Sequence, residues 1–169
     1  LAVLSLLYEN GALEKPNDLE TLIYLSIEEK NFYNAGKILQ QKINNFTDWE
    51  NSDKYKLLSQ IWFAAHETDY AKEALENAAR LSPKGDHYLE LARFYASENN
   101  WPACTKSAKK AIKKGLNSVA LDEANLIIGH SLFKGNDLSG ARKHFLEISS
   151  ETTFFDQAQS WIQYINTIH

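Results

Sequence analysis

The side chains of this 169-residue chain that could do chemistry are one cysteine, five histidines and 22 carboxylates. The histidines form no HExxH motif and no pair one helical turn apart, so the sequence does not indicate zinc binding. It also lacks a glycine-rich phosphate loop and a GxSxG nucleophile elbow. Acidic neighbours such as Asp122 and Glu123 are typical of the solvated face of an amphipathic helix. We therefore expect no enzyme, no metal site and no cofactor.

Composition limits further which kind of protein this chain can be. The chain is 44% hydrophobic and carries a formal charge of −4, which argues against nucleic acid as a partner. No apolar run reaches the roughly 18 residues of a membrane helix, so we expect no membrane insertion. A single cysteine, Cys104, excludes an internal disulfide and suits either the cytoplasm or the bacterial periplasm. Because the chain starts without methionine and inside a helical pattern, we expect it to be the C-terminal part of a longer protein.

A repeat of helix pairs organises the sequence. Small residues recur at Ala35, Ala71, Cys104 and Ala141, in steps of 36, 33 and 37 residues, close to the period of about 34 that tetratricopeptide repeats (TPRs) show. Apolar and aromatic residues keep a constant spacing around each landmark, so each set lies on one helix face. The clearest copy consists of Tyr55, Leu58, Ser59, Trp62, Ala71, Leu75, Ala78 and Pro83. Cys104 occupies a packing position, and we expect it to be buried.

The repeat predicts an all-α fold, a right-handed superhelix of about four helix pairs. We expect a single domain over 1–169, with an N-terminal helix at 1–10 and a C-terminal capping helix at 154–167. Asn17, Asp69, Asn100 and Asp137 are candidate N-caps. The repeats are expected at 17–50, 52–85, 86–118 and 120–150, and their helices at 17–29, 32–43, 52–66, 70–81, 86–98, 101–114, 120–134 and 138–149.

A basic cluster occupies the end of the helix predicted at 101–114. Such lysines could meet an acidic partner or anionic lipid. Cations are also favoured near a helix C-terminus by the macrodipole, and we favour this structural interpretation. The cluster consists of Lys106, Lys109, Lys110, Lys113 and Lys114.

The first helices of successive pairs should line a concave groove that holds a partner protein or peptide. Phe63 and Phe133 are the leading candidates, because each lies one residue past the core aromatic position, where a large apolar group has no packing role. The other residues expected in this groove are aromatic, basic, aliphatic or amide. The full predicted set is Tyr24, Ile27, Lys56, Gln60, Phe63, Leu89, Arg93, Leu126, His130, Phe133 and Lys134.

Beyond the repeat itself, residues 17–167 resemble bacterial TPR proteins encoded with TonB–ExbB–ExbD systems. The resembling segments are 71–79, 85–89, 114–116, 129–137 and 161–164. The resemblance implies a periplasmic accessory of the complex that energises outer-membrane uptake of iron carriers, and it implies no catalytic residues.

Two alternatives remain open. The first is a cytoplasmic TPR adaptor that binds a peptide tail, with Arg93, His130 and Lys134 receiving an acidic segment. The chain differs here from the TPR proteins that clamp the terminal carboxylate of a peptide tail. Glu20, Tyr24 and Leu89 occupy positions where those proteins have the clamping residues. The second is an enzyme or metal protein, which would need clustered titratable groups in a pocket. The identity of the partner and the oligomeric state stay open.

Overall fold

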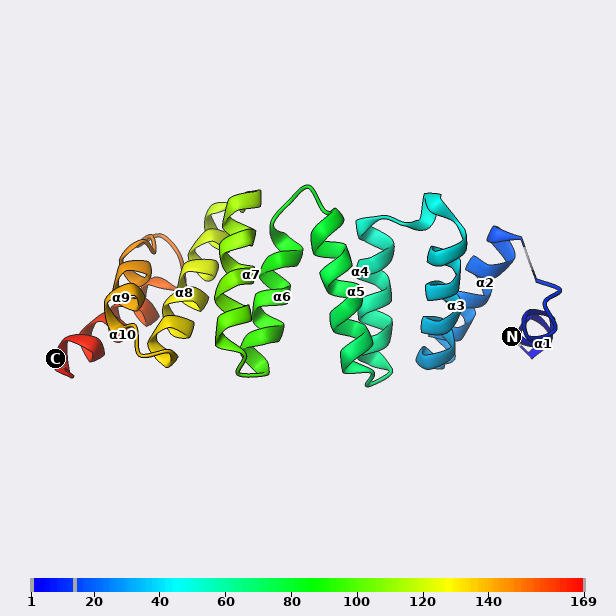
Figure 1. Cartoon of the computed structure of the whole chain (residues 1–169), viewed down its shortest axis with the longest axis horizontal. Coiled ribbons are helices and arrows are strands. Elements are labelled where there is room, and N and C mark those ends of the chain that lie inside the picture. The colour runs from blue at the N-terminus through cyan, green and yellow to red at the C-terminus, as the bar shows by residue number, and fades with distance from the viewer. Residues whose placement is uncertain (1, 14, 169) are drawn as a thin grey trace. The chain divides into compact units, whose positions relative to one another are not determined.

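The computed structural model describes residues 2–13 and 15–168, and these residues form ten α-helices, one short 3₁₀ helix and no strand. The all-α class predicted from the repeat is therefore confirmed. The described residues form four helix pairs, with one helix before them and one after (Figure 1). The chain divides into two compact units, which meet in sequence between Leu81 and Ser82. The prediction of one continuous domain over 1–169 stays a prediction.

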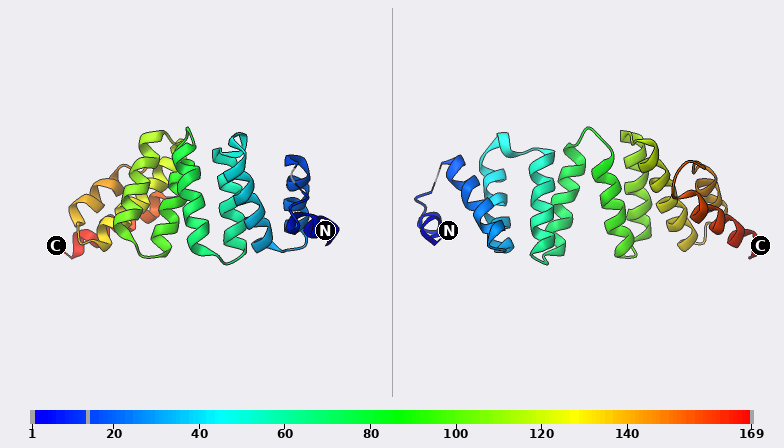
Figure 2. Two further views of the ribbon diagram at one scale, coloured as in Figure 1. Left: turned by 45° about the vertical axis from the view of Figure 1, so that its right-hand side comes forward. Right: turned by 180° about the vertical axis from the view of Figure 1, so that it is seen from behind.

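The first unit contains two helix pairs around one apolar core. In each pair the helices run antiparallel and lie side by side (Figures 1 and 2). The core is built from the repeat positions, with Ala35, Leu58 and Ala78 fully buried. The helices of this unit are α1 (Ala2–Glu9), α2 (Pro16–Glu28), α3 (Phe32–Asn45), η1 (Thr47–Trp49), α4 (Ser52–Ala64) and α5 (Thr68–Leu81).

The second unit continues the same pairing and ends with the predicted capping helix. Cys104 and Ala141 are fully buried, as their repeat positions predict. Gly129 of α8 lies so close to Phe145 of α9 that a β-carbon there would come within 2.4 Å of the ring. The final helix, α10, covers Phe145 and completes the core at this end. The helices are α6 (Asp86–Ser97), α7 (Trp101–Lys114), α8 (Ser118–Lys134), α9 (Leu138–Leu146) and α10 (Phe155–Thr167).

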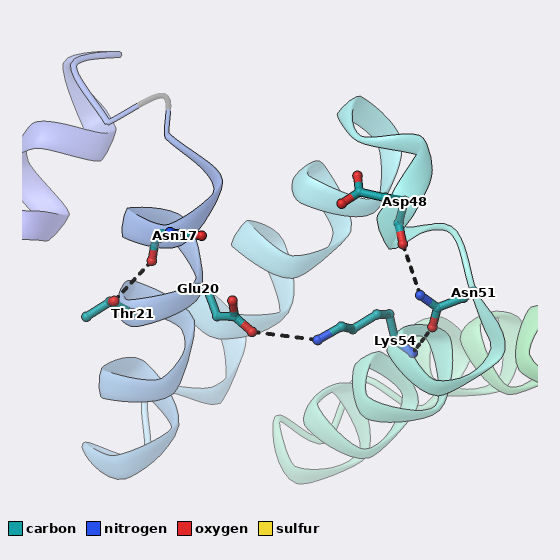
Figure 3. Close-up of polar contacts among 6 residues, drawn as sticks. All are labelled: Asn17, Glu20, Thr21, Asp48, Asn51 and Lys54. Carbon is teal, nitrogen blue, oxygen red and sulfur yellow. Dashed lines mark hydrogen bonds and ion pairs between the residues drawn. The ribbon is translucent and has the colours of Figure 1, made fainter.

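Asparagine and aspartate side chains begin several of these helices. The side chains of Asn100 and Asp137 accept hydrogen bonds from the backbone N–H three residues on, which confirms both predicted N-caps. The predictions for Asn17 and Asp69 are wrong. Lys15 is the N-cap of α2, and Asn17 uses its backbone carbonyl to accept from Thr21 (Figure 3). Asp69 lies inside the first turn of α5, where its charge complements the helix dipole.

A buried lysine links α3 to the 3₁₀ helix η1 that follows it. Lys42 is fully buried, and its Nζ lies 3.3 Å from the centroid of the Trp49 ring. Lys54 of α4 approaches the same ring at 3.9 Å and pairs with Glu20 of α2 at 3.7 Å (Figure 3). Burial lowers the pKa of Lys42, and Glu20 opposes that effect. Cation–π contacts and an ion pair therefore hold α2, α3 and α4 to one another.

The basic cluster of α7 is used at least in part within its own unit. The Lys114 ammonium donates a hydrogen bond to the backbone carbonyl of Ser82. The Nζ atoms of Lys110 and Lys114 each lie 5.2 Å from the centroid of the Tyr88 ring. These contacts support the structural interpretation of the cluster. Of the helices described, none is long and apolar enough to span a bilayer.

Candidate functional site

In the first unit the predicted groove residues lie on α2 and α4. Phe63 is 66% exposed, and Tyr24 and Gln60 are exposed as well. Ile27 and Lys56 are half-buried, and Ile27 packs against the core. A phenylalanine with this much exposure has the character expected of an interaction surface, and its contact with a partner stays a prediction.

Two of the predicted groove residues in the second unit belong to the core. Leu89 is 2% exposed and packs in one cluster with Ala111 and Ala124, and Leu126 is 9% exposed in the cluster around Phe145. Their assignment to an open groove is wrong. Leu89 of α6 packs against Ala111 of its own partner helix α7 and against Ala124 of α8. Leu126 of α8 lies in one cluster with residues of its partner helix α9 and of α10. Both side chains are therefore hidden by their own partner helix together with the helix that follows the pair.

Arg93 is exposed but already has a partner. Its Nε and one terminal nitrogen each donate to the Glu123 carboxylate at 2.6 Å, a bidentate pair between α6 and α8. The hydrogen bonds to Glu123 raise the pKa of Arg93. Because the guanidinium is committed to this carboxylate, it is a poor receptor for an acidic peptide.

Asp122 corrects the interpretation of the acidic neighbours as a solvated face. Its side chain is buried. It accepts hydrogen bonds from the Ser149 backbone N–H at 3.1 Å and from the Thr152 hydroxyl at 2.8 Å. Asp122 therefore holds the loop between α9 and α10 against α8, while its neighbour Glu123 serves Arg93.

The remaining predicted residues of α8 lead to an aromatic surface. Phe133 is half-buried, and its ring centroid lies 4.9 Å from that of Trp161 and 5.9 Å from that of Tyr164. His130 meets Trp161 edge-on at 4.6 Å, while Lys134 is exposed. The expectation that Phe133 faces outward without a packing partner is wrong, because α10 supplies two aromatic neighbours.

We call Phe133, Trp161 and Tyr164 the aromatic shelf. It lines a hollow of about 430 Å³ together with Gln157 and Ser160 of α10. Tyr164 is 50% exposed, so the shelf offers a large part of an aromatic ring to a partner. The Gln157 amide beside it can donate and accept hydrogen bonds, and the Ser160 hydroxyl, which donates to the Asp156 backbone carbonyl at 2.9 Å, can accept one. The shelf can therefore take an apolar side chain and orient the backbone that carries it.

Sequence reasoning assigned Trp161 and Tyr164 to the cap and missed their part in this hollow. The indication was present in the spacing. Ile162 and Ile165 form one apolar stripe of α10 and are buried, whereas Trp161 and Tyr164 form a second stripe on an adjacent face. A terminal helix that needs only to cover a core has no use for a second stripe.

Burial shifts the pKa values of two titratable side chains, His130 and Cys104, towards their neutral forms. Burial lowers the pKa of His130, and the charge of Lys134 lowers it further. Burial raises the pKa of the fully buried Cys104 thiol. Over residues 2–13 and 15–168, no three His, Cys, Asp or Glu side chains gather as a metal site would need. The described geometry therefore offers binding surfaces and gives no support to a metal site.

Comparison with known proteins identifies the fold. No protein-family model and no curated protein matches the chain. Among solved structures, the C-terminal part of a TPR repeat-containing protein from Cytophaga hutchinsonii is 13% identical, with a TM-score of 0.69 over 98% of this chain and 63% of that one. This chain has the fold of the TPR proteins. The fold class predicted from the repeat is confirmed.

Two further TPR-fold structures agree. MamA is 17% identical, with a TM-score of 0.63 over 83% of this chain and 80% of that one. The N-terminal domain of stress-induced protein-1 from C. elegans is 20% identical, with a TM-score of 0.58 over 65% of this chain and 93% of that domain. At such identities the likeness concerns the path of the backbone, and function has to be argued from the surfaces.

Proposed function

We propose that this chain is a protein-binding module of the TPR type, and that it anchors an apolar side chain of its partner on the aromatic shelf. The observation that carries the proposal is the hollow formed by Phe133, Trp161 and Tyr164, where aromatic rings remain open to solvent. A TPR fold presents helix faces for binding other chains, and grooves lined by apolar anchors take short helices or extended peptides.

The physical argument concerns the apolar area that the aromatic rings bury on binding and the conformational entropy that they lose. Tyrosine and tryptophan bury large apolar areas with few rotatable bonds, which makes them frequent centres of binding energy. Trp161 is held by rings on α8 and α9, with stacked Phe145 6.1 Å away, so its orientation is set before a partner arrives. A preorganised anchor site loses little conformational entropy on binding. The shelf therefore meets the physical requirements of an anchor site.

Site-specific photo-cross-linking tests the proposal. A photoreactive phenylalanine analogue at Tyr164 should capture a protein from an extract of the source organism. The same analogue at Leu146, an exposed apolar residue of α9 outside the shelf, is the matched control. The captured partner is then purified, and its affinity should fall at least tenfold for Tyr164→Glu and stay within twofold for Leu146→Glu. Equal capture at both positions, or an unchanged affinity of Tyr164→Glu, would refute the role of the shelf.

The finer form of the proposal names a partner and a compartment. A periplasmic accessory of a TonB–ExbB–ExbD system is supported by the sequence resemblance over residues 17–167 alone. An export signal encoded upstream of Leu1 and co-purification with components of that complex are the expected results. A full-length gene without such a signal would contradict the compartment, and it would leave the shelf proposal intact.

The alternative of a cytoplasmic adaptor for an acidic tail loses two of its three predicted contacts, while Lys134 is exposed. Arg93 is paired with Glu123, and burial lowers the pKa of His130, so neither offers a free positive charge near neutral pH. Titration with a capped peptide of glutamate and aspartate should show no binding that depends on Arg93. Tight binding that is lost in Arg93→Ala would restore this alternative.

A further inference from the structure

The first unit contains a second candidate site, which the sequence did not indicate. None of its lining residues belongs to the aromatic shelf. A groove of about 650 Å³ lies between α3 and α5, the second helices of two successive pairs. Residues of α4 also line it. We call it the amide groove after the uncharged amide side chains along it, which are Gln40, Gln41, Asn44, Asn45 and Asn77.

The amides of α3 offer both donors and acceptors. Gln40 donates to the Asn44 side-chain oxygen at 3.1 Å, which leaves the Gln40 oxygen and the Asn44 amino group for a ligand. The Gln41 oxygen accepts from the Tyr8 hydroxyl, so its amino group is available as well. A polypeptide backbone alternates N–H donors and C=O acceptors, and side-chain amides match both.

Length and shape favour an extended segment. The lining of α3 runs from Tyr33 to Asn45. At 1.5 Å per residue this is about 18 Å of helix. An extended peptide rises about 3.3 Å per residue, so about five residues fit along the groove.

One end of the groove is aromatic. The Trp62 ring centroid lies 5.7 Å from that of Tyr33 and 5.1 Å from that of Tyr70. Trp62 is only 5% exposed, whereas both tyrosines are about half exposed. The two tyrosines therefore flank a buried indole, and their exposed rings offer apolar faces on which one flat side chain or a proline ring can pack.

The charge of the groove selects against charged ligands. Of the described residues that line it, only Lys37 and Glu73 carry formal charge, and their charges are opposite. A strongly acidic or basic segment would gain no net attraction from this lining and would lose hydration on entering. An uncharged segment loses less hydration, and the side-chain amides of the groove can form hydrogen bonds with its backbone.

We propose that the amide groove binds an extended, uncharged segment of another polypeptide, with one ring packed on the exposed faces of Tyr33 and Tyr70. A carbohydrate is the competing ligand class, since it also pairs with amides and stacks on aromatic faces. The buried state of Trp62 disfavours it, because the largest aromatic face is not open for stacking. This site is separate from the aromatic shelf in residues and in unit, so each can fail without the other.

Selection from a random dodecapeptide library displayed on phage tests the proposal with the full chain of 169 residues. Enriched peptides should be uncharged over a stretch of about five residues. Synthetic fluorescent copies, measured by anisotropy, should bind at least tenfold more weakly to Asn44→Lys and to Tyr70→Ala. They should bind within twofold of the wild type to Gln159→Lys, a matched amide-to-lysine change on the exposed surface of α10 outside both hollows.

Each other outcome overturns the proposal. No enrichment, or enriched peptides whose affinity is the same for both groove variants, would show that the groove takes no peptide. Affinity that falls more than threefold between 50 and 500 mM salt would show a charged ligand. A glycan array in which an uncharged oligosaccharide binds the wild type and not Asn44→Lys would assign the groove to carbohydrate. Circular dichroism melting curves establish that each variant is folded, and Tyr70→Ala replaces Asn44→Lys if the latter is not.

Discussion

Gly36 of α3 lies where any β-carbon would come within 2.8 Å of the Trp62 indole of α4. The two residues belong to successive helix pairs, so this approach sets how closely one pair packs on the next. A glycine inside a helix usually weakens it, by about 1 kcal/mol relative to alanine. Here that cost is offset by the contact of a whole indole with the helix backbone.

The first prediction follows from this contact. Gly36→Ala should lower the free energy of unfolding by about 1–2 kcal/mol, because overpacking the core outweighs the better helix propensity of alanine. Urea unfolding followed by circular dichroism measures the change. The same substitution in a Trp62→Phe background should cost less, since the smaller ring leaves room for the methyl group. A Gly36→Ala variant more stable than the wild type would contradict the packing described.

Removing the indole itself is the second test of the inter-pair contact. Trp62→Ala should cost about 3–5 kcal/mol, as truncation of a large buried aromatic does. Tyr33 and Tyr70 would lose their common neighbour, so the amide groove would be distorted as well. A melting temperature equal to that of the wild type would show that Trp62 does not have the core position assigned to it.

The helices themselves could be predicted because local rules and packing agree. The helix expected at 101–114 spans Trp101–Lys114, since Asn100 caps its start and Gly115, with φ of 97°, ends it. Small residues such as Cys104 mark the close contact within each pair. Spacing, capping and composition act over a few residues, and these are visible in one sequence.

The surfaces could be predicted only in part, because burial depends on neighbours distant in sequence. Phe63 is exposed as expected, but Leu89 is covered by residues of α7 and α8. Asp122 is hidden because the loop after α9 returns to bond with it. The amide groove lies between α3 and α5, and no local pattern shows that these two helices leave a space.

The Arg93–Glu123 pair yields the third prediction. A double-mutant cycle with Arg93→Ala and Glu123→Ala should give a coupling of about 0.5–1 kcal/mol, the upper part of the range for exposed pairs, because the contact is bidentate. The coupling should fall at 1 M salt, where charges are screened. Arg93→Lys should recover less than half of it, since an ammonium cannot form the two parallel bonds. A coupling of zero would show that the pair does not persist in solution.

The fourth prediction concerns pH. His144 Nδ1 lies 3.0 Å from the Asn125 side-chain oxygen. Burial lowers the pKa of His144, and Lys109 and Lys143 lower it further. The unfolded chain, with a histidine pKa of about 6.5, thus binds this proton more readily than the folded chain. The stability due to the neutral ring is complete above pH of about 6.5 and is lost as the pH falls toward the folded pKa.

Urea unfolding between pH 7.5 and pH 5 measures this loss. His144→Gln, which stays uncharged, should show a weaker decline in unfolding free energy over the same range. His130, whose pKa burial also lowers, leaves a residual slope in that variant. The opposite slope, with stability rising on acidification and the rise abolished in His144→Gln, would contradict the assignment.

The last prediction separates the contribution of α10 to stability from its contribution to binding. Trp161 contacts His130, Phe133 and Phe145, whereas Tyr164 has half of its surface in solvent. Trp161→Ala should therefore lower the unfolding free energy by about 3 kcal/mol, the lower end for aromatic truncation, because the ring is only half-buried. Tyr164→Ser should lower it by less than about 1 kcal/mol, because the ring loses little packing. If a partner anchors on the shelf, Tyr164→Ser must nevertheless reduce binding as strongly as Trp161→Ala does in conditions where both variants are folded. Equal losses of stability for the two variants would mean that the shelf serves only to close the core.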